Sequence, residues 1–311
     1  LFETYQATRD FAPEVVVAVG GGSILDVGKS LCCLYGTDLP HADSLRRLIE
    51  EKSYGHPAAR WIGVPTTAGT GSEVTCWATI WDPERDAKRS VECRENYAFA
   101  ALVDPELAAG MPVTLAVSSA LDAAAHAVES YWAKGTNAVS RGLALEAIRT
   151  IMGHMDGLLA GTMEAHEAMA RGSMLAGLAF SNTKTTACHS ISYPLTMHCG
   201  IPHGAAVSML LGPVFQLNAQ ALARPEPLLD ALGVSSPEEL AEKVCGILRR
   251  SGQPATLKEW GAQREELPRL ARLGMTKGRA DNNPVPIEPA TILSILEQIY
   301  DSSCKLTRKG A

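Results

Sequence analysis

The 311-residue chain lacks the features that mark several large classes of protein. No apolar run is long enough to span a bilayer and no signal peptide is evident, which argues against a membrane or secreted protein. Lysine and arginine form no basic cluster and the net charge is −6, so we expect no nucleic-acid partner. The eight cysteines are irregularly spaced without a C-x-x-C pair, which excludes a zinc knuckle, a dithiol redox motif and a disulfide framework. With 46% hydrophobic and 20% charged residues, the chain is predicted to be a globular, cytoplasmic protein.

Four side chains form a candidate metal site. Asp122 and His126 are four residues apart in SALDAAAHAVES, a helix-favouring stretch, so they share one helical face. His189 and His203 stand at either end of HSISYPLTMHCGIPH, and three residues between them predict a turn: Pro194, Gly200 and Pro202. One carboxylate and three imidazoles suit Fe(II), Zn(II) or another divalent ion and leave a coordination position open to substrate. Taken alone, however, the helical pair is more often a cap or an ion pair, and the two histidines are more often hydrogen-bonded turn residues.

Two further segments have the composition of a nucleotide site. In EVVVAVGGGSILDVGK, an apolar run at 15–19 predicts a buried parallel strand, and a helix is expected over 24–34. A glycine turn between strand and helix brings backbone N–H groups to a phosphate, although the motif is not G-x-G-x-x-G and a simple tight turn is commoner. In WIGVPTTAGTGSEVTCWATIWD, strands expected at 61–64 and 75–81 flank a loop rich in hydroxyls. Two roles are open for that loop: it binds a pyrophosphate or a ribose, or it is a polar connection that binds no ligand.

In this order, GGGSILDVGK, PTTAGTGSEV, LVDPELAAGMPVTLAVSSALDAAAHAVESY and CHSISYPLTMHCGIPHG resemble the iron-containing (group III) alcohol dehydrogenase family. The resemblance runs from about residue 15 to about residue 219 and resumes weakly near the C-terminus. It implies a metal bound by four residues: Asp122, His126, His189 and His203. It also implies contacts to NAD or NADP from the glycine turn, the hydroxyl loop and two further residues: Gly20, Gly21, Gly22, Ser23, Thr66, Thr67, Thr70, Ser72, Asp26 and Lys88.

The resemblance implies hydride transfer between a nicotinamide and the carbonyl carbon of a small aldehyde, or back from its alcohol, with the metal as Lewis acid. One proton must also be exchanged with solvent. Many relatives carry a histidine four residues after the third ligand, whereas this chain has Tyr193, which either donates through its hydroxyl or lines the pocket. His198 is a second candidate for the proton relay, although a solvated turn residue is the commoner role.

Two sequence segments that contain basic residues indicate the charge of the substrate. Lys184 lies five residues before His189, and MTKGRADNNP adds four polar residues: Lys277, Arg279, Asn282 and Asn283. Cations beside hydrogen-bond donors suit an anionic group, although most lysines and arginines are simply solvated. KTTACHSISYPLT and TKGRADNNP are similar to the phosphonoacetaldehyde reductase branch of the family. That similarity implies reduction of phosphonoacetaldehyde to 2-hydroxyethylphosphonate, with Lys184 and Arg279 as phosphonate contacts and the two asparagines beside them.

The pattern of expected elements changes near Met111 and Pro112. Before this point short apolar runs alternate with helical stretches, as in parallel βα units, and after it helices are expected over 115–132, 140–159, 163–178, 204–217, 236–248 and 289–300. We predict an α/β nicotinamide dinucleotide-binding domain at 1–111 and a helical metal-binding and substrate domain at 112–311, with the site in the cleft between them. The resemblance implies the dehydroquinate synthase-like fold of iron alcohol dehydrogenases.

Relatives have two or three further strands before the GGGS segment, whereas 14 residues precede Val15 here. We therefore expect that the start of the α/β domain is missing, and with it the residue that separates NAD from NADP. Three alternatives stay open: a dehydrogenase of a simple alcohol, diol or oxoacid, a sugar-phosphate cyclase of the dehydroquinate synthase type, and a non-catalytic nucleotide-binding module. Relatives often form dimers, so a homodimer is open as well.

Overall fold

A small parallel sheet forms the centre of the N-terminal lobe in the computed structural model, which describes residues 1–85 and 87–301. The strand order is β1 (Val15–Gly20), β2 (Arg60–Pro65) and β5 (Ala100–Ala101), and β1 and β2 pair along their whole length. Their β-branched and aromatic residues favour the extended conformation. Because the strands are parallel, the glycine turn after β1 and the hydroxyl loop after β2 lie at the same edge of the sheet.

Only one face of this sheet is covered. Helix α2 (Gly22–Leu34) packs on β1 and β2, and its buried residues share an apolar cluster with Trp61. The side chains on the other face of β1, Val15, Val17 and Val19, are 48%, 57% and 55% exposed. The predicted strand at 15–19 is therefore present and parallel, but the prediction that it is buried is wrong for one face, because no described element covers those valines.

An antiparallel hairpin stands apart from the sheet. The strand predicted at 75–81 is β3 (Trp77–Asp82), which pairs with β4 (Ala87–Glu92). Asp82 accepts hydrogen bonds from Arg46 of α3 (Ala42–Glu51) at 2.8 and 3.0 Å and from Arg89 of β4 at 3.2 Å. These ion pairs tie the hairpin to α3, and the lobe also contains α1 (Phe2–Thr8).

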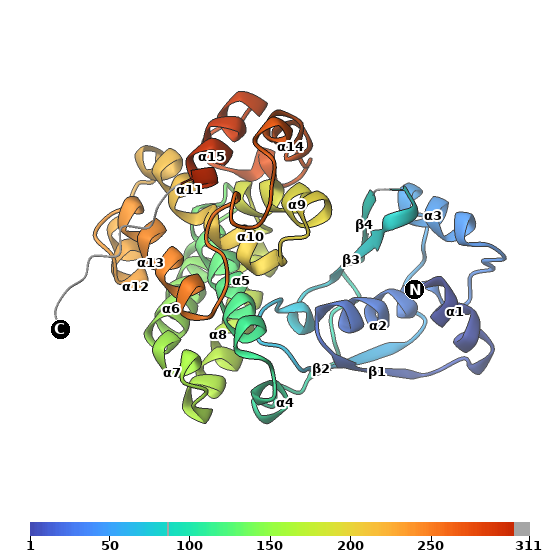
Figure 1. The fold of residues 1–311 in the computed structure, drawn as a ribbon. Coiled ribbons are helices and arrows are strands. Elements are labelled where there is room, and N and C mark those ends of the chain that lie inside the picture. The colour runs from blue at the N-terminus through green and yellow to red at the C-terminus, as the bar shows by residue number, and fades with distance from the viewer. Residues whose placement is uncertain (86, 302–311) are drawn as a thin grey trace.

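The second lobe is helical, and Figure 1 shows it beside the α/β lobe. Its helices are α4 (Glu106–Ala109), α5 (Val113–Trp132), α6 (Ala138–Gly153), α7 (Met155–Leu159), α8 (Met163–Thr183), α9 (Ala187–Cys199), α10 (His203–Met209), α11 (Leu211–Asn218), α12 (Glu226–Leu232), α13 (Pro237–Arg250), α14 (Leu267–Leu273) and α15 (Pro289–Asp301). Short 3₁₀ segments lie at Arg9–Phe11, Ser72–Val74, Pro83–Arg85, Ala219–Ala221, Arg264–Glu266 and Ala280–Asn282. Helix α5 packs against α6, α8 and α10, and its many small residues allow neighbours on every side.

Several predicted boundaries are wrong for identifiable reasons. The helix predicted over 140–159 is divided at His154 into α6 and α7, and the one over 204–217 is divided at Leu210, because Pro213 lacks the N–H that would continue α10 into α11. Conversely, Pro194 lies inside α9, where a turn was predicted. The helix continues through Pro194 because buried residues on both sides of the proline hold it in place. It ends at Gly200, which has a left-handed φ of +67°.

The predicted pair of lobes, α/β and then helical, is confirmed. The boundary at residues 111 and 112 stays a prediction, and residues 302–311 of the predicted second domain lie outside the described chain. Within the described residues, no helix has the length and apolar character needed to cross a membrane.

Candidate active site

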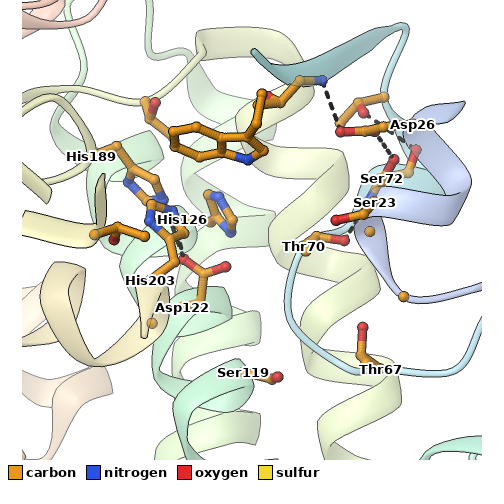
Figure 2. Close-up of a pocket in the computed structure, with 18 of the residues that line it drawn as sticks. Ser23, Asp26, Thr67, Thr70, Ser72, Ser119, Asp122, His126, His189 and His203 are labelled. Carbon is orange, nitrogen blue, oxygen red and sulfur yellow. Dashed lines mark hydrogen bonds and ion pairs between the residues drawn. The ribbon is translucent and has the colours of Figure 1, made fainter. Parts of the chain in front are cut away.

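A cavity of about 520 Å³ opens between the two lobes. One side is formed by the glycine turn, the hydroxyl loop and the β3–β4 hairpin, and the other by helices α5, α8, α9 and α10. Figure 2 shows its two ends. Four residues stand at the end near the α/β lobe: Ser23, Asp26, Thr70 and Ser72. Asp122 and three histidines stand at the other end.

Asp122, His189 and His203 each bring a ligand atom into one cluster, with all three atoms within 4.8 Å of one another. Asp122 Oδ1 lies 3.4 Å from His189 Nε2 and 3.7 Å from His203 Nε2. Asp122 Oδ1, His189 Nε2 and His203 Nδ1 are buried without a hydrogen-bond partner. An unpartnered buried polar atom costs about 1–3 kcal/mol, so the lone pairs of Asp122 Oδ1 and His189 Nε2, which face each other, fit a bound metal ion. His203 turns its Nε2 toward the same carboxylate.

The close approach of α10 to α5 brings His203 to Asp122. A Cβ on Gly204 would lie 1.9 Å from the carbonyl oxygen of Ser118, one helical turn before Asp122. Only glycine allows this contact, and the residue before it is therefore held against α5.

His126, the fourth predicted ligand, lies beside this cluster. Its ring is stacked between Phe180, at 4.2 Å between ring centres, and His189, at 4.3 Å. Its Nδ1 is 3.3 Å from the carbonyl oxygen of Gly69. A ring N–H donated to a carbonyl leaves the lone pair on Nε2, the arrangement usual for a ligating histidine. Ligation by His126 itself stays a prediction.

Glu129 is a residue that the sequence reasoning missed. It is fully buried, and its carboxylate accepts hydrogen bonds from Thr186 Oγ1 at 2.8 Å and Cys188 N at 2.6 Å and is hydrogen-bonded to His189 Nδ1. With Nδ1 facing a carboxylate, His189 presents Nε2 to Asp122. Glu129 lies seven residues after Asp122 on the same face of α5, and that spacing was the available signal.

The imidazoles of the cluster differ in the direction in which burial and charge shift their pKa values. Burial lowers the pKa of His126 to about 4 and that of His203 to about 3, so both imidazoles are neutral near neutral pH. Burial works against the ionised form of Asp122, but the neighbouring imidazoles, His126 first, outweigh it and lower the pKa of the carboxyl. Burial also works against the charged form of His189, but Glu129 and Asp122 raise its pKa.

At the opposite end, the glycine turn packs directly on the hydroxyl loop. A Cβ on Gly22 would lie 2.6 Å from Thr70, and one on Gly21 would lie 3.3 Å from Thr67. Gly21 is the N-cap of α2, so the first turn of this helix opens to the cavity, where its N–H groups and dipole favour a phosphate. Two predicted cofactor contacts, Gly20 and Thr66, do not line the cavity, whereas the other predicted residues of the turn and loop do.

Asp26 and Ser72 line the same end and are bound to each other. Ser72 Oγ donates to Asp26 Oδ1 at 2.6 Å. Lys29, which the sequence reasoning also missed, is completely buried and donates to Ser72 O, Ser72 Oγ, Thr75 Oγ1 and Trp77 O over 2.7 to 3.0 Å. Burial lowers the pKa of Lys29, and Asp26 opposes that effect from 3.6 Å. Lys29 thus joins α2 to the hydroxyl loop and β3.

Tyr193 lies between the histidine cluster and two basic side chains. Its ring stacks on His203 with 5.7 Å between ring centres. Lys88 Nζ lies 3.2 Å from the centre of the Tyr193 ring, and Arg279 Cζ lies 5.4 Å from it. In the described part of the chain, these are the lysine and the arginine that line the cavity. Burial raises the pKa of Tyr193 to about 12, and burial together with Arg279 lowers the pKa of Lys88 well below its usual value.

Besides Gly20 and Thr66, four further predicted site residues do not line the cavity: His198, Lys184, Asn282 and Asn283. Lys184 Nζ forms an ion pair with Glu92 at 2.9 Å. Asn282 donates to two backbone carbonyls of the segment before α9, and Asn283 exchanges hydrogen bonds with Asn218 at 2.7 and 2.9 Å. The asparagines therefore hold the loop that carries Arg279 against the helical lobe.

Comparison with known proteins gives a consistent family. The sequence profile of the iron-containing alcohol dehydrogenases matches residues 1–105, and that of the C-terminal part of the Fe-containing alcohol dehydrogenase family matches residues 116–300. The 1,3-propanediol dehydrogenase of Klebsiella pneumoniae is 30% identical over 92% of this chain and 76% of its own length. The phosphonoacetaldehyde reductase of Streptomyces viridochromogenes is 34% identical over 68% of this chain and 54% of its own length.

A solved structure extends the comparison. Sulfoacetaldehyde reductase from Bifidobacterium kashiwanohense in complex with NAD⁺ is 29% identical, covers 97% of this chain and 80% of its own, and has a TM-score of 0.88. The chain belongs to the iron-containing alcohol dehydrogenase family, as the sequence motifs predicted. It is an iron-type oxidoreductase that uses a divalent metal ion and NAD or NADP, and the cyclase alternative is not favoured.

Proposed function

We propose that this enzyme reduces a small aldehyde bearing an anionic group, with phosphonoacetaldehyde, reduced to 2-hydroxyethylphosphonate, as the specific substrate. One observation carries the proposal: Arg279 lines the cavity beside the metal-ligand cluster, and neither it nor Lys88 forms an ion pair with a carboxylate in the described chain. A positive charge without a partner in a substrate cavity favours an anionic ligand. Two relatives are named for aldehydes with an anionic group, the phosphonoacetaldehyde and sulfoacetaldehyde reductases, and they support the same class of substrate.

The residues divide the chemistry between them. Asp122, His189 and His203, with His126 as predicted fourth ligand, would hold the metal, which when bound supplies a Lewis acid for the carbonyl oxygen. Glu129 keeps His189 in the tautomer that ligation requires. At the other end, the start of α2 and the hydroxyl loop would receive the dinucleotide.

Tyr193 stays the leading candidate for the proton relay. Its pKa of about 12 keeps the phenol protonated near neutral pH, and its ring lies against His203. His198 lies outside the cavity and is the weaker candidate. Cytoplasmic location and a homodimer also stay predictions.

The test is oxidation of NADH and NADPH by Fe(II)- or Zn(II)-loaded protein, with phosphonoacetaldehyde beside 3,3-dimethylbutanal, a neutral aldehyde of matching shape. We expect a higher kcat/KM for the phosphonate, because the neutral compound leaves Arg279 without an anion. Turnover of neutral aldehydes alone would instead assign a simple alcohol or diol substrate, as in the 1,3-propanediol dehydrogenase. The choice between the two dinucleotides is read from the same assay.

A further inference from the structure

Four buried side chains form a continuous chain of hydrogen bonds behind the histidine cluster. Trp132, the last residue of α5, has its Nε1 2.8 Å from Thr186 Oγ1. Thr186 Oγ1 is in turn 2.8 Å from Glu129 Oε1, and Glu129 Oε2 is hydrogen-bonded to His189 Nδ1. Each of the four residues is 2% exposed or less. A buried donor is unfavourable without an acceptor, so each hydrogen is expected on the bond that the geometry offers.

The chemistry of these groups sets the direction of the bonds. The indole nitrogen of Trp132 can only donate, so Thr186 Oγ1 accepts from it and turns its own hydrogen to Glu129 Oε1. Hydrogen bonds donated to a carboxyl favour its ionised form, which only accepts. His189 therefore donates its Nδ1–H to Glu129 Oε2 and keeps its lone pair on Nε2, 3.4 Å from Asp122 Oδ1.

Thr186 is available for this bond because it does not cap its own helix. It is the N-cap residue of α9, where a threonine usually accepts from the first turn, yet its side chain accepts no such bond. Glu129 Oε1 takes that place, because it accepts from Cys188 N at 2.6 Å and from His189 N at 3.4 Å. The dipole of α9 also favours a carboxylate there. One oxygen of Glu129 thus holds the start of α9, and the other holds the imidazole.

We propose that Thr186 and Trp132 are positioning residues of the metal centre: the hydrogens that they donate hold Glu129 in the orientation that turns His189 Nε2 toward the ion. The inference rests on the ligation by His189 that belongs to the proposed function. Neither Thr186 nor Trp132 lines the cavity, so an effect of either residue on the ion has to pass through the residues between them.

The experiment measures the dissociation constants of Zn(II) and Co(II), by competition with a chelator, in variants of these two residues. Thr186→Val nearly keeps the volume but donates nothing to Glu129, so we expect metal affinity to fall by about tenfold, and Thr186→Ser should restore it to within about twofold. Trp132→Phe leaves the hydroxyl in place without its donor and should lower the affinity by about threefold. The absorption spectrum of bound Co(II), which reports ligand geometry, should change in Thr186→Val and match wild type in Thr186→Ser.

A matched control and a double variant separate positioning from packing. Thr183 is also buried, and it donates to Ser130 Oγ at 3.0 Å rather than to Glu129, so Thr183→Val should keep the metal affinity of wild type. Because Thr186 acts through Glu129, adding Thr186→Val to Glu129→Gln should lower the affinity no further than Glu129→Gln alone.

Three results would count against these assignments. Unchanged metal affinity in a folded Thr186→Val variant would overturn the inference, even if its thermal unfolding midpoint fell, because the role would then be structural. Losses that add in the double variant would also overturn it, because Thr186 would then act without Glu129. If Thr186→Val does not fold, wild-type affinity in Trp132→Phe decides against the inference. Full metal content in His189→Ala would instead overturn the ligation by His189, and with it that part of the proposed function.

Discussion

The two ends of the cavity treat their buried polar atoms in opposite ways. At the end of the cavity that holds Asp122 and the three histidines, Asp122 Oδ1 and His189 Nε2 face each other without a hydrogen-bond partner, and His203 Nδ1 is a third buried atom without one. At the opposite end, Ser72 donates to Asp26, and the three N–H groups of Lys29 share four acceptors between 2.7 and 3.0 Å away. The polar atoms at the first end need a ligand as their partner. Those at the second end are already hydrogen-bonded to one another, and we call this set of bonds the closed network.

This difference has an energetic consequence. Each unpartnered buried atom costs about 1–3 kcal/mol of folding free energy, and we expect a metal ion that binds such atoms to offset that cost. Ion binding should therefore stabilise the folded protein, by mass action as well as by contact. We propose that the dinucleotide binds at this second, already ordered surface, so its affinity should depend on how rigidly that surface is held.

The largest effect should come from removing a metal ligand. His203→Ala deletes one of the three clustered donors, so we expect loss of bound metal and of hydride transfer while the protein stays folded. Metal per protein is measured by elemental mass spectrometry, and folding by circular dichroism. His56→Ala, which removes an imidazole that is 86% exposed on its side chain and remote from the cavity, is the control. Unchanged metal content in His203→Ala would take His203 out of the site.

The next effect tests the closed network. Lys29→Met removes the cation that joins α2 to the hydroxyl loop and leaves several acceptors unpaired, so we expect the free energy of unfolding to fall by about 3 kcal/mol. Urea titration measures this loss, and the dissociation constant of NADH should rise while metal content stays constant. Lys243→Met, a partly buried lysine in the helical lobe that donates mainly to Leu232 O, is the matched control. If Lys29→Met lost metal and kept its affinity for NADH, Lys29 would support the end with Asp122 and the histidines, and the contrast drawn between the two ends would be wrong.

The sequence predicted the fold and the meeting of Asp122 with the three histidines at one cavity for a physical reason. Asp122 and His126 are one helical turn apart, so their placement needs only a helix, and the lobes follow from the change in periodicity at residue 111. Glu129 was missed because its partner, His189, is 60 residues away and only the packing of α9 on α5 brings them together. The direction of a side chain is also absent from the sequence. Lys184 and Arg279 were equal candidates for the anion contact until the structure placed one of them in the cavity.

A smaller effect tests how the metal end is supported from behind. Glu129→Gln keeps the size of the side chain but places an NH₂ donor where two hydrogen bonds are accepted, so His189 is less firmly held. We expect metal affinity to fall by about tenfold to a hundredfold, the usual consequence of losing such a support. Ser130→Ala, next along α5, removes a buried hydroxyl that bonds Thr183 and does not contact His189. Equal metal affinity in Glu129→Gln and wild type would show that packing alone orients the imidazole.

The smallest effect is expected at Lys184, and it sharpens the assignment of the anion contact. Lys184 ends α8 with a φ of +60°, and its ammonium pairs with Glu92 of the hairpin rather than lining the cavity. The side chains of this pair are 47% and 33% exposed, and such a pair contributes about 1 kcal/mol or less. Lys184→Ala should therefore leave kcat/KM for phosphonoacetaldehyde within about twofold of wild type, since it removes only this weak pair and a cation–π contact with Trp77 at 5.9 Å. A selective loss on the anionic aldehyde, with the neutral aldehyde unaffected, would mean that the ammonium leaves Glu92 and reaches the substrate, as the sequence alone suggested.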